Sequence, residues 1–280
     1  MAKKNKSGLN DMGSIKTAVP EVEPIPPSDE PIVYTTEELH AIREAKAKLD
    51  ADPKVGFVNT RFLAYTTIVS KLRVDETVQK YKKFIKAINS CGVPLVESDE
   101  DLWSDPDIPG HLRQYYKACG PDFNGRSILW IQGDTIPVDQ EATSVRAGIL
   151  YTVAIHGDVK SLREGITFVI DLTKASKDKR VGNESKLQRV NQSYPIRPQI
   201  ILFAGASMAY RVVVNSLITV ASLFTKQKIL QRIRFASMDQ AKERVPLNSA
   251  PVYVGGGGGD IQDVVEWTKE RYYKIPIPAL

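Results

Sequence analysis

The sequence predicts an α/β fold, with a mainly parallel five-stranded sheet flanked by helices and a helical N-terminal lobe. Two observations lead to this prediction. Short, almost wholly apolar segments recur in the second half of the chain, and long helix-like segments separate them. Strands that are apolar along their whole length are typical of parallel sheets whose two faces are both covered. A chain of 280 residues is long enough to bury such a sheet in a sizeable core.

Four apolar segments are the predicted principal strands. They are RSILWIQ (126–132), GITFVIDL (165–172), RPQIILFA (197–204) and the final part of KQKILQRIRFAS (226–237), and VYV (252–254) is the predicted fifth strand. Between them lie two long helical patterns, at 138–157 and 207–224, and a basic stretch at 173–194 that is predicted to form a loop and a helix. The chain therefore alternates between strand and helix from residue 126 onward.

The N-terminal part of the chain is expected to be organised differently. Residues 1–33 are polar and rich in proline, which predicts a disordered tail. Residues 34–98 are predicted to form a helical lobe, with one helix starting in a capping-box pattern at Thr36 and another capped by Asp75. An acidic connection broken by prolines follows, and the main domain is expected to span 115–280.

The residue inventory argues against a metal site, a cofactor and catalysis. The two cysteines, Cys91 and Cys119, lack metal-ligand spacing, and no histidine has a histidine partner three or four positions along the chain. No P-loop and no nucleophile-elbow motif is present. So few cysteines favour a reducing compartment, and no apolar run reaches the roughly 18 residues of a spanning helix. We therefore expect a cytoplasmic protein with no metal, no cofactor and no enzymatic activity.

The stretch VYVGGGGGD (252–260) raises the question of a nucleotide-binding loop. Gly255 and Gly257 fit the first two positions of a dinucleotide-binding fingerprint, but the third position is Asp260, whose charge would repel a pyrophosphate. Too few residues follow Gly259 for a helix and a second parallel strand. We interpret the glycines as a turn and Asp260 as the N-cap of a C-terminal helix.

Asp171, at the end of the predicted strand GITFVIDL, leaves two interpretations open. It is either a buried group bonded to the backbone or to an arginine, or a catalytic acid. The sequence offers no companion nucleophile or base for it. An α/β enzyme that uses Asp171 therefore stays as an alternative hypothesis.

The predicted helix at 207–224 is more apolar than a surface helix over a sheet needs to be. Its polar residues, among them Arg211, Asn215 and Thr219, form only a narrow stripe. Either protein covers both sides of this helix, or one side faces a lipid-filled cavity or a membrane. Basic residues flank it in the sequence, which favours docking on anionic headgroups at about 1 kcal/mol per basic residue near the membrane. Aromatic residues for base stacking are sparse, so no nucleic-acid partner is expected.

The order of these segments resembles the CRAL-TRIO (Sec14-like) lipid-binding domain family over about residues 115–275. The matching motifs are the strand ending in Asp171–Leu172, the aromatic–proline pair Tyr194–Pro195, the long helix at 207–224, the strand after it and the turn at Gly255–Gly256. Arg61–Phe62–Leu63 is a weaker match to the helical N-terminal lobe of that family. In this resemblance the glycine run is the closing turn of the family, lengthened.

The resemblance implies a pocket on one face of the sheet for one hydrophobic molecule, closed by a gate helix at 207–224 that swings open at a membrane. The implied function is to bind, transfer or present that molecule, not to break bonds. The candidate pocket residues are Ile166, Phe168, Ile170, Ile201, Phe203, Tyr210, Val213, Val214, Leu217 and Ile218. The expected partners of this monomer are a hydrophobic small molecule or lipid and an anionic membrane surface, bound peripherally.

Two departures from phospholipid-binding members bear on the ligand. Members that bind phosphatidylinositol carry an acid just after the aromatic–proline pair and a lysine near the fourth strand, where this chain has Ile196 and Arg232. Members that bind phosphatidylcholine carry small hydroxyl residues on the strand where this chain has Ile166 and Phe168. The apolar character of these positions is closer to the tocopherol- and retinal-binding branch.

A basic patch of the tocopherol-carrying members, which contacts phosphoinositides outside the pocket, is partly kept. Arg197, Lys228 and Arg232 match it, whereas a further basic position is Gln199 here. The alternative for these residues is a solvated basic surface. The alternative for the whole protein is a non-exchanging scaffold or adaptor in membrane trafficking or signalling, with the N-terminal tail as its working part.

Overall fold

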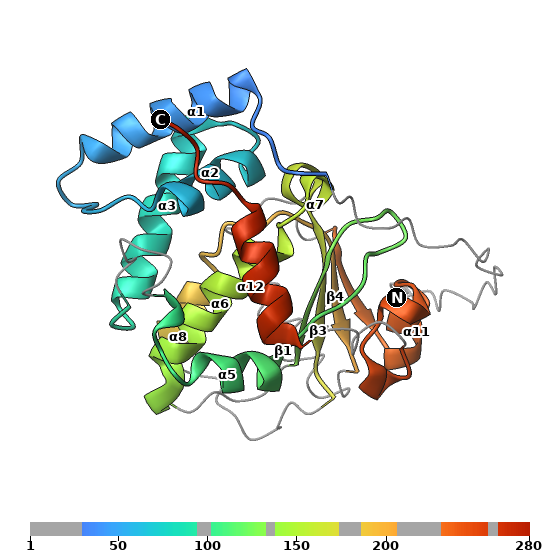
Figure 1. Ribbon diagram of the computed structural model, residues 1–280. Helices are drawn as coiled ribbons and strands as arrows, with labels where there is room; N and C mark the ends of the chain where they lie inside the picture. The colour runs from blue at the N-terminus through green and yellow to red at the C-terminus, as the bar shows by residue number, and fades with distance from the viewer. Residues whose placement is uncertain (1–29, 94–101, 133–137, 174–185, 206–230, 257–262) are drawn as a thin grey trace, which may run out of the picture.

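The computed structural model describes residues 30–93, 102–132, 138–173, 186–205, 231–256 and 263–280 (Figure 1). Helices α1 (Thr36–Asp50), α2 (Thr60–Val69) and α3 (Val74–Asn89) form an N-terminal lobe, and a five-stranded sheet with its flanking helices forms the rest. The predicted α/β class with a helical N-terminal lobe is confirmed.

The sheet has the strand order β1–β2–β3–β4–β5. Its parallel strands are β2 (Ile128–Gln132), β3 (Ile166–Asp171), β4 (Pro198–Ala204) and β5 (Ile233–Ala236), and β1 (Tyr116–Lys117) pairs with β2 in the antiparallel sense. Each parallel strand lies next to the one before it in the sequence. The mainly parallel, five-stranded sheet that the apolar segments predict is therefore present.

The fifth strand is β1, so the prediction of a strand at 252–254 is wrong. Val252–Val254 forms a 3₁₀ turn, η3, between Pro251 and Gly255. Gly255 has a left-handed φ of 85°, and its N–H donates to the Val252 carbonyl over 2.7 Å. A proline on one side and a left-handed glycine on the other bend the chain at both ends, so these three residues cannot extend along a neighbouring strand.

Helices cover the two faces of the sheet unequally. Helices α6 (Glu141–Ile155), α7 (Val159–Glu164) and α8 (Lys186–Asn191) lie between successive parallel strands in the sequence and contribute to the larger hydrophobic core. This core includes Leu129 and Ile166 on one side of the sheet, which we call the α6 face. The other side, the α11 face, carries a smaller core with α11 (Met238–Lys242) and η2 (Leu247–Ser249) nearby. Figure 1 shows α6 and α11 on opposite sides of the strands.

The starts of α1 and α3 differ by one or two residues from the sequence prediction. The N-cap of α1 is Thr35, whose hydroxyl accepts from the Glu38 N–H over 3.1 Å while the Glu38 carboxylate accepts from the Thr35 N–H over 2.8 Å. A capping box needs its acid three residues after the cap, and this spacing holds for Thr35 and not for Thr36. The N-cap of α3 is Arg73, so Asp75 lies in the first turn of that helix.

The C-terminal helix α12 (Val264–Lys274) also begins later than expected. Its N-cap is Asp263, whose carboxylate accepts from the Val265 N–H over 2.8 Å, whereas Asp260 lies outside the described residues. Helix α12 runs beside α6 (Figure 1), with α5 (Ile108–Tyr115) close to both. These three helices form the middle layer between the sheet and the N-terminal lobe.

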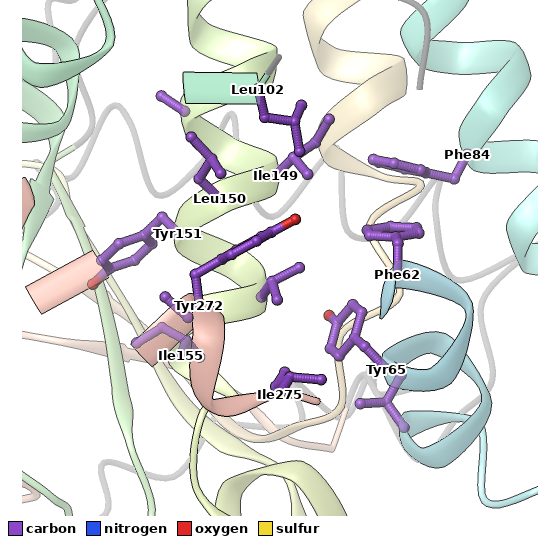
Figure 2. Close-up of a cluster of buried hydrophobic side chains, with 14 of the residues drawn as sticks. Phe62, Tyr65, Phe84, Leu102, Ile149, Leu150, Tyr151, Ile155, Tyr272 and Ile275 are labelled. Carbon is purple, nitrogen blue, oxygen red and sulfur yellow. The ribbon is translucent and has the colours of Figure 1, made fainter. Parts of the chain in front are cut away.

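The larger core joins the N-terminal lobe to this middle layer. Phe62 and Phe84 of the lobe stack with their ring centres 4.8 Å apart. Figure 2 shows both rings facing Ile149 of α6 and Tyr272 of α12. All four side chains belong to one continuous cluster of buried residues. The lobe and the sheet therefore share a core.

The residues that follow α12 lie against the N-terminal lobe. Three donors of the lobe bond carbonyls of this segment: Tyr34 to Pro276 at 2.6 Å, Arg43 to Ala279 at 3.3 Å, and Arg61 to Ile275. The Arg61 guanidinium is buried and also lies 5.3 Å from the ring centre of Tyr272. These bonds connect residues that are more than two hundred positions apart in the sequence.

A buried ion pair anchors α12 beside the start of β2. Asp158 caps α7, and its carboxylate lies 2.6 Å from the Arg271 guanidinium of α12. The Ser127 hydroxyl donates to the same carboxylate over 2.8 Å, and the Ser161 N–H donates to its other oxygen over 2.7 Å. Arg271 also donates to the Ala154 carbonyl over 3.1 Å. Both carboxylate oxygens of Asp158 and the Nε and Nη2 atoms of Arg271 therefore have partners, which offsets the cost of burying the two charges.

In the described part of the chain, no helix combines the length and the apolar character that crossing a membrane would require.

Asp158→Asn is expected to lower the free energy of unfolding by about 3 kcal/mol, because Arg271 keeps a buried charge without its counterion. Urea unfolding at pH 7 measures the change. The matched control is Asp50→Asn, which breaks the exposed pair between Lys46 and Asp50 on α1 and should change stability by less than about 0.5 kcal/mol. Equal effects of the two substitutions would contradict the anchoring role of Asp158.

Candidate functional site

Six large apolar side chains of β3, β4 and β5 lie together on the α6 face of the sheet. Residues paired between parallel strands point to the same face, and the register arranges these six in two rows. The rows are Phe168–Ile201–Ile233 and Ile170–Phe203–Phe235. We call this set of six residues the apolar strip.

The apolar strip is only partly buried, unlike the other face of the same strands. All six of its side chains have intermediate exposure. On the α11 face, Val169 and Leu202 of the same strands are fully buried in the smaller core. Phe168 packs against the larger core on the α6 face, and the other five residues of the strip are neither part of this core nor packed against it. The cores of the described residues therefore leave this apolar surface partly open, which is a common property of binding surfaces.

The apolar strip holds four of the predicted pocket residues, namely Phe168, Ile170, Ile201 and Phe203. Ile166 is separate from them, because it is fully buried in the larger core. The predicted residues of the gate helix, Tyr210, Val213, Val214, Leu217 and Ile218, lie outside the described residues. Sequence analysis missed Ile233 and Phe235, although the alternation in IRFA (233–236) is the signal that places them on one face.

Asp171 points to the α11 face and is 1% exposed. One carboxylate oxygen accepts from the N–H and the hydroxyl of Thr173, over 2.9 Å and 2.7 Å. The other accepts from the Tyr253 hydroxyl, which itself accepts from the Trp130 indole N–H over 2.8 Å. Asp171 is therefore a buried group bonded to the backbone. Its side-chain partners are the hydroxyls of Thr173 and Tyr253 and not the arginine that the sequence suggested.

This network holds η3 against the end of β3. Burial raises the pKa of the Tyr253 hydroxyl, and the hydrogen bond to Asp171 raises it further, so Tyr253 stays protonated and keeps donating. Both oxygens of Asp171 are occupied by donors from the protein itself. The geometry accounts for Asp171 as a structural residue that fixes the turn before the glycine run.

Two residues of the predicted basic patch come together at the starts of β4 and β5. Arg197 donates to the Arg163 carbonyl, and Arg232 donates to the Pro198 carbonyl over 2.7 Å. Burial lowers the pKa of Arg197, and the positive charges of Arg232 and Arg73 lower it further. Both guanidinium groups bond carbonyls, and the Glu164 carboxylate near Arg197 partly offsets their positive charge. Lys228, the third predicted residue, lies outside the described residues.

Arg73 is a basic residue near this site that sequence analysis did not single out. It follows the turn between α2 and α3, in which Lys71 and Leu72 have left-handed φ values of 59° and 57°. Such values strain non-glycine residues by on the order of 1 kcal/mol each. Arg73 pairs with Glu76 over 2.7 Å. Its effect on Arg197 arises only from the packing of the lobe on the sheet, so no sequence signal marks it.

The described residues offer no cluster of histidine, cysteine or acidic side chains suited to a metal ion. His111 and His156 are buried, and burial lowers the pKa of each to about 4, so both are neutral at pH 7. The Nδ1 atom of His156 lies 2.8 Å from the Thr152 carbonyl. His40 is exposed on α1. These histidines therefore behave as core or surface side chains.

The aromatic–proline pair at 194–195 connects the N-terminal lobe with α6. The Pro195 carbonyl accepts from the Tyr65 hydroxyl of α2 over 2.6 Å, and the Tyr194 hydroxyl donates to the Val145 carbonyl of α6 over 3.2 Å. Gly148 leaves the room for this contact, because a Cβ atom there would overlap the Tyr194 hydroxyl. The segment entering β4 is thus held from both sides.

No protein-family model matches the chain, and no curated protein matches it at a significant level. The resemblance to the CRAL-TRIO family therefore rests on the order of the sequence motifs alone.

Gly148→Ala is expected to destabilise the fold by about 1–3 kcal/mol, because the new methyl group and the Tyr194 hydroxyl would occupy the same space. Adding Tyr194→Phe removes that hydroxyl, so the double variant should be more stable than the sum of the two single changes predicts. Gly110→Ala, on α5 with open space at its Cβ position, is the control and should be neutral or slightly stabilising. Strict additivity in urea unfolding would contradict this contact.

Proposed function

We propose that the protein binds one hydrophobic, lipid-like molecule against the apolar strip and transfers or presents it at membranes, as the CRAL-TRIO (Sec14-like) proteins that it resembles do. The observation that carries this proposal is the partial exposure of six large apolar side chains on one face of a sheet whose other face is closely packed. Pockets for small molecules are lined mainly by apolar and aromatic side chains. The apolar strip has this composition.

Burial of the apolar strip supplies the driving force in this proposal. Each 100 Å² of apolar surface removed from water contributes about 2.5 kcal/mol. A ligand that covers several of the six side chains would therefore bind through hydrophobic contact alone. No bond-making step and no catalytic group is needed.

The proposal gives residues 207–224 the role of a gate. They belong to the connection between β4 and β5, and connections between neighbouring parallel strands are right-handed in nearly all proteins. The earlier connections, through α6 and α8, contribute to the core on the α6 face. We propose that the β4–β5 connection has the same hand and covers the face that carries the apolar strip. An apolar helix on this side would shield the ligand from water and release it by moving.

The arginines at the starts of β4 and β5 support docking on an anionic membrane. The positive charges of Arg232 and Arg73 lower the pKa of Arg197, against the opposing effect of the Glu164 carboxylate. Basic residues near an anionic surface contribute about 1 kcal/mol each. With Lys228, these residues form the proposed contact with phosphoinositide headgroups.

Native mass spectrometry of the purified protein, followed by solvent extraction, tests the binding proposal. One hydrophobic molecule per chain is expected, either retained from the expression host or acquired from mixed-lipid vesicles. A bare mass after incubation with vesicles would contradict the proposal and favour the non-exchanging scaffold or adaptor.

Arg197→Glu combined with Arg232→Glu is expected to weaken binding to phosphoinositide-containing vesicles by roughly tenfold or more, because two attractive charges become repulsive. Vesicle co-sedimentation at low salt measures the change. The control is Lys83→Glu, which reverses one charge in the same way on the exposed surface of α3. It should have a smaller effect. Unchanged binding of the double variant at low salt would remove the docking proposal.

A further inference from the structure

We propose that the proline-rich segment 19–27 of the N-terminal tail docks on an apolar surface of its own chain. This surface lies where the chain that enters α1 meets the segment that follows α12. We call it the terminal surface and define it by the exposed side chains of Val33, Tyr273, Ile277 and Leu280. The inference goes beyond the lipid-binding proposal, because no residue of the apolar strip takes part in it.

Large apolar side chains are unusually exposed on the terminal surface. The exposed fraction is 70% for Val33, 61% for Ile277, 46% for Leu280 and 42% for Tyr273. These four make up half of the eight large hydrophobic residues that are exposed in the described part of the chain. Single exposed apolar residues are ordinary, whereas a group of them in one region indicates a contact surface.

A hydrogen bond between the two segments brings Val33 and Ile277 to the same region. The Tyr34 hydroxyl donates to the Pro276 carbonyl over 2.6 Å. Val33 directly precedes the donor in the chain and Ile277 directly follows the acceptor. Figure 1 shows the segment after α12 running along the lobe to α1.

Two further contacts place Tyr273 and Leu280 beside the lobe. The ring centre of Tyr273 lies 5.3 Å from the Arg61 guanidinium at the start of α2. Leu280 follows Ala279, whose carbonyl accepts from Arg43 of α1 over 3.3 Å. All four apolar side chains therefore lie where the lobe meets the end of α12 and the residues after it.

The segment after α12 presents its apolar side chains from an ordered backbone. Ile275 and Pro278 are buried, whereas Ile277 and Leu280 are exposed. Pro276 and Pro278 also restrict φ, which limits the conformations open to this segment. A surface that is already ordered loses little conformational entropy when a partner binds.

The sequence of segment 19–27, VPEVEPIPP, fits such a surface. Its apolar residues Val19, Val22 and Ile25 recur at every third position, and four prolines lie among them. Proline favours the polyproline II helix, which has three residues per turn, so in that conformation the three apolar side chains would share one side. Proline-rich segments of this kind bind to surfaces lined by aromatic and apolar side chains.

The tether between this segment and the terminal surface favours docking within one chain. Ile25 lies eight positions before Val33, and eight extended residues reach about 27 Å. A short flexible tether keeps a segment at an effective concentration on the order of millimolar near its site. Docking within the chain therefore needs only a weak affinity to be populated.

Photo-crosslinking of the full chain tests the inference. The photoreactive residue p-benzoyl-phenylalanine replaces Ile277, and mass spectrometry after irradiation identifies the crosslinked peptides. The matched control carries it at Val252, which is exposed on η3. Random collisions of the tail would label both positions alike. We expect crosslinks from position 277 to segment 19–27, with at least about ten times the yield of those from position 252.

Isotope mixing shows which chain supplies the crosslinked segment. Equal amounts of unlabelled and ¹⁵N-labelled chain are irradiated together. Crosslinks that join position 277 to segment 19–27 of the same chain would support the inference. Crosslinks between labelled and unlabelled chains alone would assign the surface to a second copy and overturn it. The absence of any crosslink to segment 19–27 would overturn it as well. None of these outcomes depends on whether the protein captures a lipid.

Substitutions within the tail give a second readout. Val22→Asp with Ile25→Asp should lower the crosslink yield at position 277 by about tenfold or more, because two carboxylates would have to leave water. The matched control is Leu9→Asp with Ile15→Asp, which adds the same charge to the tail outside segment 19–27. It should leave the yield unchanged. An unchanged yield in the first variant, or an equal loss in both variants, would overturn the inference.

Discussion

The two-residue alternation of side chains along β3, β4 and β5, held in parallel register, is the constraint on which the rest of this structure depends. It places the six residues of the apolar strip on one face and Asp171 and Arg234 on the other. A slip of one residue would exchange the two sets and put a carboxylate on the apolar surface. A slip of β3 would also move Asp171 away from Tyr253, which bonds Trp130 of β2 as well, so this network opposes the slip.

The position of Arg197 and Arg232 at the starts of β4 and β5 depends in turn on how the N-terminal lobe is attached. Arg163 of α7 bonds Glu38 of α1 over 2.8 Å through its side chain, and its carbonyl accepts from Arg197. One residue thus connects the lobe with the start of β4. This attachment, together with the shared core around Phe62, places Arg73 near enough to Arg197 for its charge to lower the pKa of Arg197. This cluster of basic residues is therefore a product of tertiary packing and does not belong to any single element.

The sequence was most informative where one local pattern decides the structure. The long apolar runs predicted β2, β3 and β4 because such segments have few places to lie outside a covered sheet. The segment at 252–254 has the same composition, but the flanking Pro251 and Gly255 decide its conformation. Ile166 is apolar and lies on the same face of β3 as Phe168 and Ile170, so the sequence pattern placed it in the predicted pocket. Its burial depends on where α6 and α7 end, which a strand pattern does not contain.

The bonds between the N-terminal lobe and the segment after α12 also bear on how the protein is made. Tyr34 and Pro276 are separated by 242 positions, and Arg61 and Ile275 by 214. A ribosome would therefore release the lobe long before these partners exist. Until then the buried position of Arg61 lacks its acceptor carbonyl, and the core beside Phe62 lacks Tyr272. Folding during synthesis should accordingly leave the lobe open until α12 has emerged, which makes this protein a candidate for chaperone protection at that stage.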